Sequence, residues 1–283
     1  MGAVAHRSAF RIPFSPVLLQ MTSRKQTEET MANVGQNILV VSIAVIGSIL
    51  LQAGLNHIWP WEKRRTYIDL IGWHFSVLGT TYAVILGFML YAVWTAFGDA
   101  DLNVDLEANA VVDMHHLAKG LPEPQRTQLQ TLAGSYADTV ITRDWPQMAR
   151  GEVPEETEAI KSEMWDTVIS VRAASATEIT AQQHGLSQLS SLDQHRLTRI
   201  RQSTTSLPRV LWCVLLAGGA LTIISACMFG AENMKLQTLQ VVSFSLLISL
   251  SLVAIADIHR PFHGLIHVRN DGFLRARHIM QVR

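Results

Sequence analysis

Residues 75–97 form an apolar segment, and His74 precedes it. One face of this stretch combines polar groups at both ends with large apolar side chains in the middle. Stepping the positions at 100° per residue, as in a helix, gives this face the following side chains: His74, Val77, Thr81, Ile85, Phe88, Ala92 and Thr95. Such a face is typical of a pore in which Ile85 and Phe88 form a constriction that excludes water. We therefore interpret His74, Thr81, Ile85, Phe88 and Thr95 as candidate pore-lining residues. The alternative is that this face contacts lipid.

Small residues recur on a different face of the same segment. Gly79, Ala83 and Gly87 are spaced at i, i+4 and i+8. This spacing forms a stripe that lets another helix approach closely. We predict that these three residues mediate helix packing.

Acidic residues follow directly after this segment. We interpret Asp101, Asp105, Glu107 and Asp113 as a candidate acidic vestibule, because a ring of such carboxylates in an oligomer would concentrate cations. One alternative is an ordinary solvated helix face. Another is that a new helix starts after Gly98, where acids near its N-terminus would stabilise it.

A further charged pair follows the last apolar segment. Asp257 lies three residues before Arg260, which is the spacing of an ion pair on one helix at a membrane boundary. We predict that this pair fixes the exit of the helix from the membrane.

The sequence contains no pattern of an enzyme or a metal site. His259, His263 and His267 share the spacing of one helical face, but Pro261 and Gly264 interrupt any such helix. The motifs of P-loop, serine-hydrolase, zinc-protease and dinucleotide-binding enzymes are absent. We therefore predict no catalytic residue, no bound metal and no cofactor.

The groups above must be positioned by four segments that lack charged residues: 38–58, 75–97, 210–231 and 236–256. A helix needs about 20 apolar residues to cross about 30 Å of hydrocarbon. Hydrophobic residues make up 48% of the chain and charged residues 16%. We predict an integral membrane protein with four transmembrane helices in contact with the lipid bilayer. The formal net charge of zero gives no basic excess for binding nucleic acid.

The patterns of the remaining segments indicate helices and chain termini, so we predict an all-α protein. Its expected parts are a disordered basic tail (1–33), two transmembrane helices (34–97), a cytoplasmic helical domain (98–207), two more transmembrane helices (208–258) and a C-terminal cytoplasmic segment (259–283). Within the domain, Gly120-Leu121-Pro122 and His184-Gly185 are the expected helix ends.

The distribution of basic residues predicts the orientation. Four spans place both termini and the middle segment on one side, and most of the flanking arginines, such as Arg201, Arg209 and Arg260, lie there. Cytoplasmic loops carry an excess of Lys and Arg, so we predict an inner (plasma) membrane protein with both termini in the cytoplasm. The compact cluster Lys63-Arg64-Arg65 favours the opposite orientation.

Several motifs resemble a known family in their order and spacing. They are LGTTYAVILGFML (78–90) with Trp94, ADLNVDLEANAV (100–111), GLP (120–122), WP (145–146), LPRVLW (207–212) and DIHRPFHG (257–264). From the second span onward the chain resembles the bestrophin-like domain family of bacterial membrane proteins, which is distantly related to the bestrophin ion channels. This resemblance implies four spans, a cytoplasmic helical domain and a homo-oligomer, with a pentamer as the suggested assembly, around a pore lined by the second span. The sequence has no acidic run resembling the calcium clasp of animal bestrophins.

Two functions follow as hypotheses. The first is a homo-oligomeric ion channel or pore that passes small inorganic ions passively. The second is a non-conducting scaffold or signalling protein that recruits a partner through its helical domain. A channel requires the face from Thr81 to Phe88 to lie on a symmetry axis, whereas a scaffold can show that face to lipid.

Overall fold

The computed structural model describes residues 16–281, with side chains from residue 34 onward, and this part of the chain is helical without strands. The α-helices are α1 (Pro16–Ile58), α2 (Trp61–Arg64), α3 (Ile68–Leu117), α4 (Gln125–Thr139), α5 (Trp145–Ala149), α6 (Glu156–Ile169), α7 (Ala176–Thr204), α8 (Arg209–Met228), α9 (Met234–Ile258) and α10 (Asp271–Gln281). Short 3-10 helices η1 (Arg65–Tyr67) and η2 (Ala118–Gly120) and the π-helix η3 (Val140–Asp144) complete them. The prediction of an all-α fold is confirmed.

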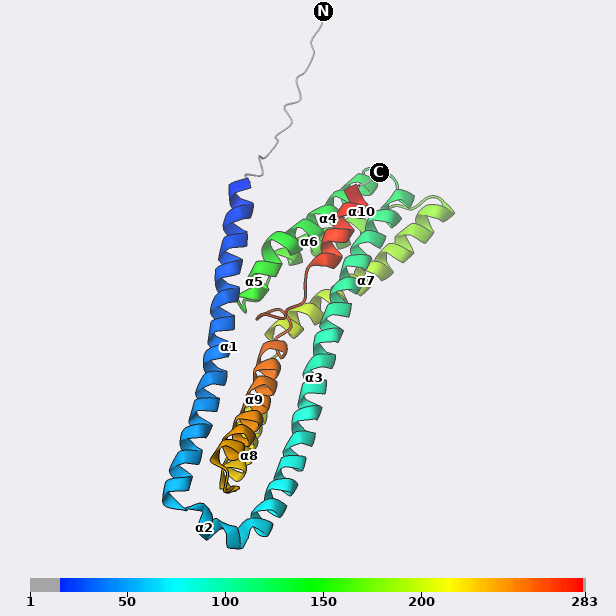
Figure 1. The fold of residues 1–283 in the computed structure, drawn as a ribbon. Helices are drawn as coiled ribbons and strands as arrows, with labels where there is room; N and C mark the ends of the chain where they lie inside the picture. Colours follow the sequence, from blue (N-terminus) through cyan, green and yellow to red (C-terminus); the bar gives the residue numbers. More distant parts are fainter. Residues whose placement is uncertain (1–15, 282–283) are drawn as a thin grey trace, which may run out of the picture.

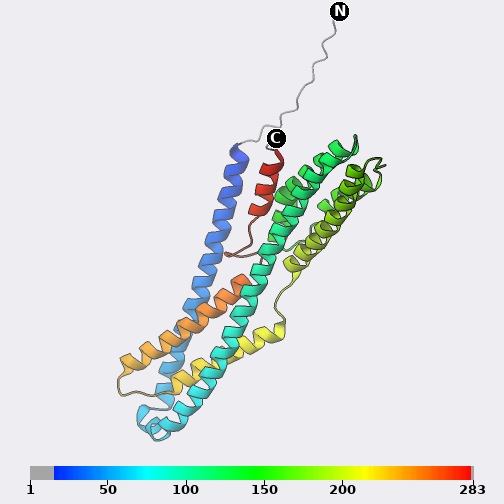
Figure 2. The same ribbon diagram turned by 90° about the vertical axis from the view of Figure 1, so that its right-hand side faces the viewer.

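The helices form two regions along one long axis. Helices α8 and α9 lie between the lower parts of α1 and α3, whereas α4 to α7 and α10 gather around the upper part of α3 (Figures 1 and 2). In the described part of the chain, four helical segments are long and apolar enough to cross a membrane: Val34–Ile58, Trp61–Gly120, Arg209–Met228 and Met234–Ile258. The predicted multi-pass membrane architecture is therefore confirmed.

Helix α3 connects the two regions without a break. Its 50 residues span about 75 Å at 1.5 Å per residue, so it extends well beyond the membrane. No proline interrupts it, and Gly98 lies within regular helix. The idea that a new helix starts after Gly98 is therefore wrong, because the acids that follow belong to the middle of a helix.

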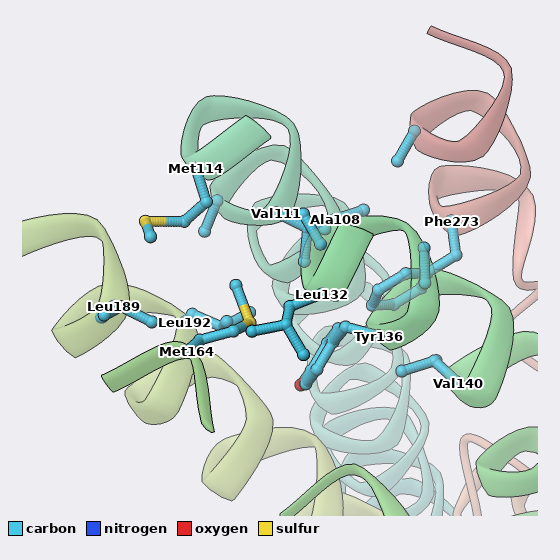
Figure 3. Packing of buried hydrophobic residues seen from close by; sticks show 14 of the residues in the cluster. Ala108, Val111, Met114, Leu132, Tyr136, Val140, Met164, Leu189, Leu192 and Phe273 are labelled. Carbon is cyan, nitrogen blue, oxygen red and sulfur yellow. The ribbon is translucent and has the colours of Figure 1, made fainter. Parts of the chain in front are cut away.

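The upper group of helices, which comprises the upper part of α3, α4 to α7 and α10, is called the middle domain below. It has a hydrophobic core built on α3. Val111 and Met114 of α3 contribute to it with Tyr136 of α4, Met164 of α6 and Leu189 of α7, all of which are fully buried (Figure 3). Phe273 of α10 joins the same core, and its ring meets that of Trp145 in an edge-to-face arrangement. The chain after the last span therefore folds back onto the domain and belongs to it.

Two helix boundaries differ from the predictions. Helix α1 extends back to Pro16, so residues 16–33 are helical rather than disordered, while residues 1–15 lie outside the described part. Helix α7 continues through Gly185, which packs against Val168 of α6 and where a Cβ would lie at an ordinary contact distance of 3.5 Å from Cγ1 of Val168. The boundary between α6 and α7 instead lies before Ser175. This residue caps α7 in a reciprocal capping box with Glu178.

The loop between the first two spans is anchored to the end of α8. The buried guanidinium of Arg64 donates to the carbonyl oxygens of Cys227 and Met228, at 3.0 and 3.3 Å, and also to Asn56. A cation at a helix C-terminus is favourable because the last carbonyls carry partial negative charge. Arg64 therefore has a structural role at this end of the bundle.

Helices α3 and α8 pack through two glycines of α8. The ring of Tyr82 lies against Gly218 and Gly219, and its hydroxyl donates to the carbonyl of Leu215 at 3.0 Å. A Cβ at Gly218 would lie 2.5 Å from Cδ2 of Tyr82, which is closer than any real contact. Close approach in this bundle therefore depends on a glycine of α8.

We expect Gly218→Val to destabilise the bundle by about 1–3 kcal/mol, because the new side chain overpacks against Tyr82. The measurement is the free energy of unfolding of the purified protein in detergent. Gly47→Val on α1 is the matched control, since a Cβ at Gly47 meets no atom within 4 Å. Equal losses in both variants would contradict this packing.

Candidate functional site

Most of the predicted pore face of α3 is not covered by any other part of the described chain. His74, Thr81 and Thr95 are exposed, and Phe88 is 71% exposed. The adjoining side of α3, about 100° around the helix, is occupied, since Tyr82 and Val93 are buried. The chain therefore leaves this face free for lipid, for another subunit or for an aqueous pathway.

Ile85 departs from the predicted face. It is half-buried and packs against the cluster of Val93, Leu215, Ile255 and Ile258 between α3, α8 and α9. Its neighbour Val84 is 53% exposed, one helical turn before Phe88. The structure thus exposes Val84 and Phe88 as adjacent large apolar side chains near the middle of the apolar segment 75–97, in place of the predicted pair Ile85 and Phe88.

His74 lies near the end of the bundle that carries α2. Its Nδ1 is 3.3 Å from Oγ of Ser225 on α8, a hydrogen bond that links the start of the pore face to the bundle. The ring also borders an apolar groove of about 570 Å³ with Trp59, Tyr67 and Trp73.

No helix in the described part of the chain packs on the small-residue stripe. A Cβ at Gly79 or Gly87 would meet no atom within 4 Å, and Ala83 is exposed. Within the described chain, close helix packing occurs at Gly218 and Gly219 instead. The stripe is thus a free surface on α3.

The four predicted vestibule acids have different surroundings. Asp101 and Asp113 are exposed on α3. Asp105 is partly exposed, and its Oδ1 accepts a hydrogen bond from Arg275 of α10 at 2.7 Å. Glu107 is fully buried, so its assignment to an acidic vestibule is wrong. Position 107 lies on the buried side of α3. The presence of an acidic residue in a charged segment does not indicate which side of the helix it occupies.

Glu107 is instead part of a buried ionic network at the centre of the middle domain. Its carboxylate accepts from Nε and Nη2 of Arg199, at 2.7 and 3.0 Å, and from the hydroxyl of Tyr136 at 2.7 Å. Arg199 also donates to Asp144 at 3.0 Å, and Asp144 accepts from Thr157 at 2.9 Å. The network therefore joins α3, α4, η3, α6 and α7.

The network keeps its groups in defined charge states. Desolvation lowers the pKa of Arg199, but the ion pair with Glu107 outweighs it, so the pKa is raised overall. Burial, together with the negative charge of Glu107, raises the pKa of Tyr136 well above its usual value. Tyr136 therefore remains a neutral donor.

Sequence reasoning missed this network, although α7 carried a signal for it. Its buried positions recur every three or four residues: Ala181, Gly185, Leu189, Leu192, Arg196, Arg199 and Ser203. Two arginines on the apolar stripe of a helix indicate buried partners, because an unpaired buried charge is very costly. Arg196 also has an acidic partner, since its Nη1 lies 2.7 Å from Glu158, but the side chain of Glu158 is 54% exposed.

Asp257 and Arg260 do not form the predicted ion pair. The two oxygens of Asp257 accept from the backbone N–H groups of Leu265 and Ile266, at 2.9 and 3.0 Å. Gly264 permits this turn with a φ of 86°, and a Cβ there would lie 2.5 Å from Oδ1 of Asp257. The carboxylate therefore holds the loop after α9, and Arg260 forms no ion pair in the described chain.

No group of three or more His, Cys, Asp or Glu side chains that could hold a metal ion occurs between residues 34 and 281. His259, His263 and His267 do not share one helix, because α9 ends at Ile258.

Comparison with known proteins identifies the family. The bestrophin-like domain matches residues 42–273. A single-substitution variant of a bacterial bestrophin homolog from Klebsiella pneumoniae has a similar structure, with a TM-score of 0.65 and 15% identity over 87% of this chain and 97% of that one. Another structure of that homolog, phased with zinc, gives a TM-score of 0.63 and 16% identity over 86% of this chain and 96% of that one. A search of curated proteins found no match.

Identities this low show a shared fold alone. The family match has more weight, because it includes the second, third and fourth spans, the middle domain and most of the first span. The protein belongs to the bestrophin-like family.

Proposed function

We propose that the protein is a homo-oligomeric channel that passes small inorganic ions passively, with the exposed face of α3 lining the pathway. The main support is that Val84 and Phe88 project from a membrane-spanning helix without any covering element in the described chain. Around a symmetry axis, such side chains would form a narrow apolar ring. Thr81 and Thr95 would provide polar groups on either side of it.

The free stripe of Gly79, Ala83 and Gly87 supports oligomerisation. Small residues in a membrane helix promote close association, and residues 34–281 leave this stripe without a partner helix. We infer that a neighbouring subunit packs there, and a pentamer is the assembly suggested by the resemblance to bestrophins.

The charge distribution supports a cytoplasmic location of both termini and the middle domain. Arg209 and Arg260 are exposed at the domain-side ends of α8 and α9. On the other side, Arg64 is buried and bound to carbonyl oxygens of α8, so its structural role explains one member of the opposing cluster. The remaining excess of basic residues on the domain side favours a cytoplasmic location of that side.

Cysteine accessibility tests the pathway directly. In a Cys213→Ser background, we expect cysteines at Val84 and Phe88 to react in proteoliposomes with a water-soluble, membrane-impermeant thiol reagent. Leu247→Cys is the control, because Leu247 is 62% exposed on α9 and should face lipid. Equally slow reaction at all three positions would contradict an aqueous pathway and favour the scaffold hypothesis.

Without Glu107, the candidate acidic vestibule has a testable consequence for ion preference. Asp101 is exposed without an ion pair in the described chain, whereas Arg275 neutralises Asp105. We therefore expect Asp101→Asn to reduce cation preference, seen as a shift in reversal potential under a salt gradient, and Asp105→Asn to shift it less. Identical reversal potentials for wild type and Asp101→Asn would refute a vestibule at this position.

A further inference from the structure

A polar groove lies between α1 and the end of α9, where the apolar window of the first span begins at Ile38 and the fourth span ends at Ile258. Its volume is about 380 Å³, and its polar lining comes from Gln36, Asn37, Asp257, His259, Arg260 and His263. Since both spans end at this level, the groove opens at the boundary between hydrocarbon and water on the side of the middle domain.

Among the described residues, the groove contains a cation without an acidic partner. The one carboxylate of its described lining, that of Asp257, is engaged by the backbone N–H groups of Leu265 and Ile266. Arg260 is exposed and forms no ion pair within the described residues, although it lines the groove. The loop geometry that uses Asp257 therefore leaves the guanidinium available for an external anion.

The other side chains of the groove supply neutral hydrogen-bonding groups. Gln36 and Asn37 bring amide donors from α1. Nδ1 of His259 lies 2.7 Å from the carbonyl of Ala256, and its ring packs edge-to-face on Trp212. Burial lowers the pKa of His259 and of His263, and the nearby Arg260 lowers them further, so at neutral pH the positive charge comes from Arg260.

We propose that this groove binds the phosphate headgroup of an anionic phospholipid from the leaflet on the domain side. A guanidinium pairs strongly with a phosphate through parallel hydrogen bonds, and the groove lies at the depth where lipid phosphates lie. Trp212 at the start of α8 has the position typical of an interfacial aromatic residue. The site links α1 to the end of α9 and does not depend on ion conduction.

The test is a lipid titration of the purified full-length protein in neutral detergent, followed by native mass spectrometry. The probes are short-chain phosphatidylglycerol, phosphatidylcholine and inorganic phosphate. We expect phosphatidylglycerol to bind more tightly than phosphatidylcholine, and Arg260→Gln to weaken it about fivefold. Arg172→Gln, which removes an exposed arginine at the far end of the domain, should leave the affinity unchanged.

Equal affinity of wild type and Arg260→Gln for phosphatidylglycerol would overturn the proposal. Displacement of the lipid by millimolar inorganic phosphate would overturn the lipid assignment and indicate a soluble phosphate ligand. Asn37→Leu provides a second variant on the opposite wall, and it should also weaken phosphatidylglycerol binding. An unchanged affinity in that variant, with an unchanged unfolding temperature, would place the lipid elsewhere.

Discussion

Arg199→Met should lower the free energy of unfolding of the middle domain by about 3–5 kcal/mol, because it leaves two buried carboxylates without their cation. Glu107 and Asp144 are fully buried, so water cannot replace the guanidinium. The measurement is denaturant-induced unfolding of the purified protein in detergent, followed by the fluorescence of Trp145 and Trp165 in the same domain.

Arg150→Met is the matched control for this prediction. Arg150 pairs with Glu152 at 2.7 Å, but its side chain is 57% exposed, so its loss should leave the stability nearly unchanged. The double variant Glu107→Gln with Arg199→Met should lose less stability than the sum of the two single variants, because the two residues interact directly. Additive losses would show that the buried pair does not act as a unit.

Phe88→Ala should raise ion flux through proteoliposomes roughly tenfold, which corresponds to a decrease of about 1.4 kcal/mol in the barrier to permeation. The proposed reason is that removing the ring widens an apolar constriction and lets water fill it. Leu247→Ala is the control, since it also removes a large exposed apolar side chain from a span. A flux that stays at the wild-type level in Phe88→Ala would argue against a constriction at this residue.

The membrane architecture could be predicted from the sequence because it depends on local composition. Each apolar window became a span, since apolar length alone determines whether a helix can cross the bilayer. The face of α3 that carries Thr81 and Phe88 was also predictable, because helical periodicity fixes which residues point in one direction. Ile85, at the edge of that face, turns toward its own bundle, and His74 is linked to the bundle by a hydrogen bond with Ser225.

The contacts of the charged residues could not be predicted in the same way. Glu107 and Arg199 are 92 positions apart, and Asp105 and Arg275 are 170 apart, so no local pattern connects them. The assumption that nearby opposite charges pair with each other failed at Asp257 and Arg260. Backbone N–H groups of the following loop compete for that carboxylate, and a spacing rule contains no information about them.

The central claim is that several copies of the chain form an ion-conducting pathway along α3. The most direct measurement is ion flux through the purified wild-type protein in liposomes, together with the mass of the solubilised complex. The account predicts a homo-oligomer with flux above that of empty liposomes. A monomer, or a stable oligomer without flux across a range of pH, calcium and voltage, would contradict it and support a non-conducting scaffold.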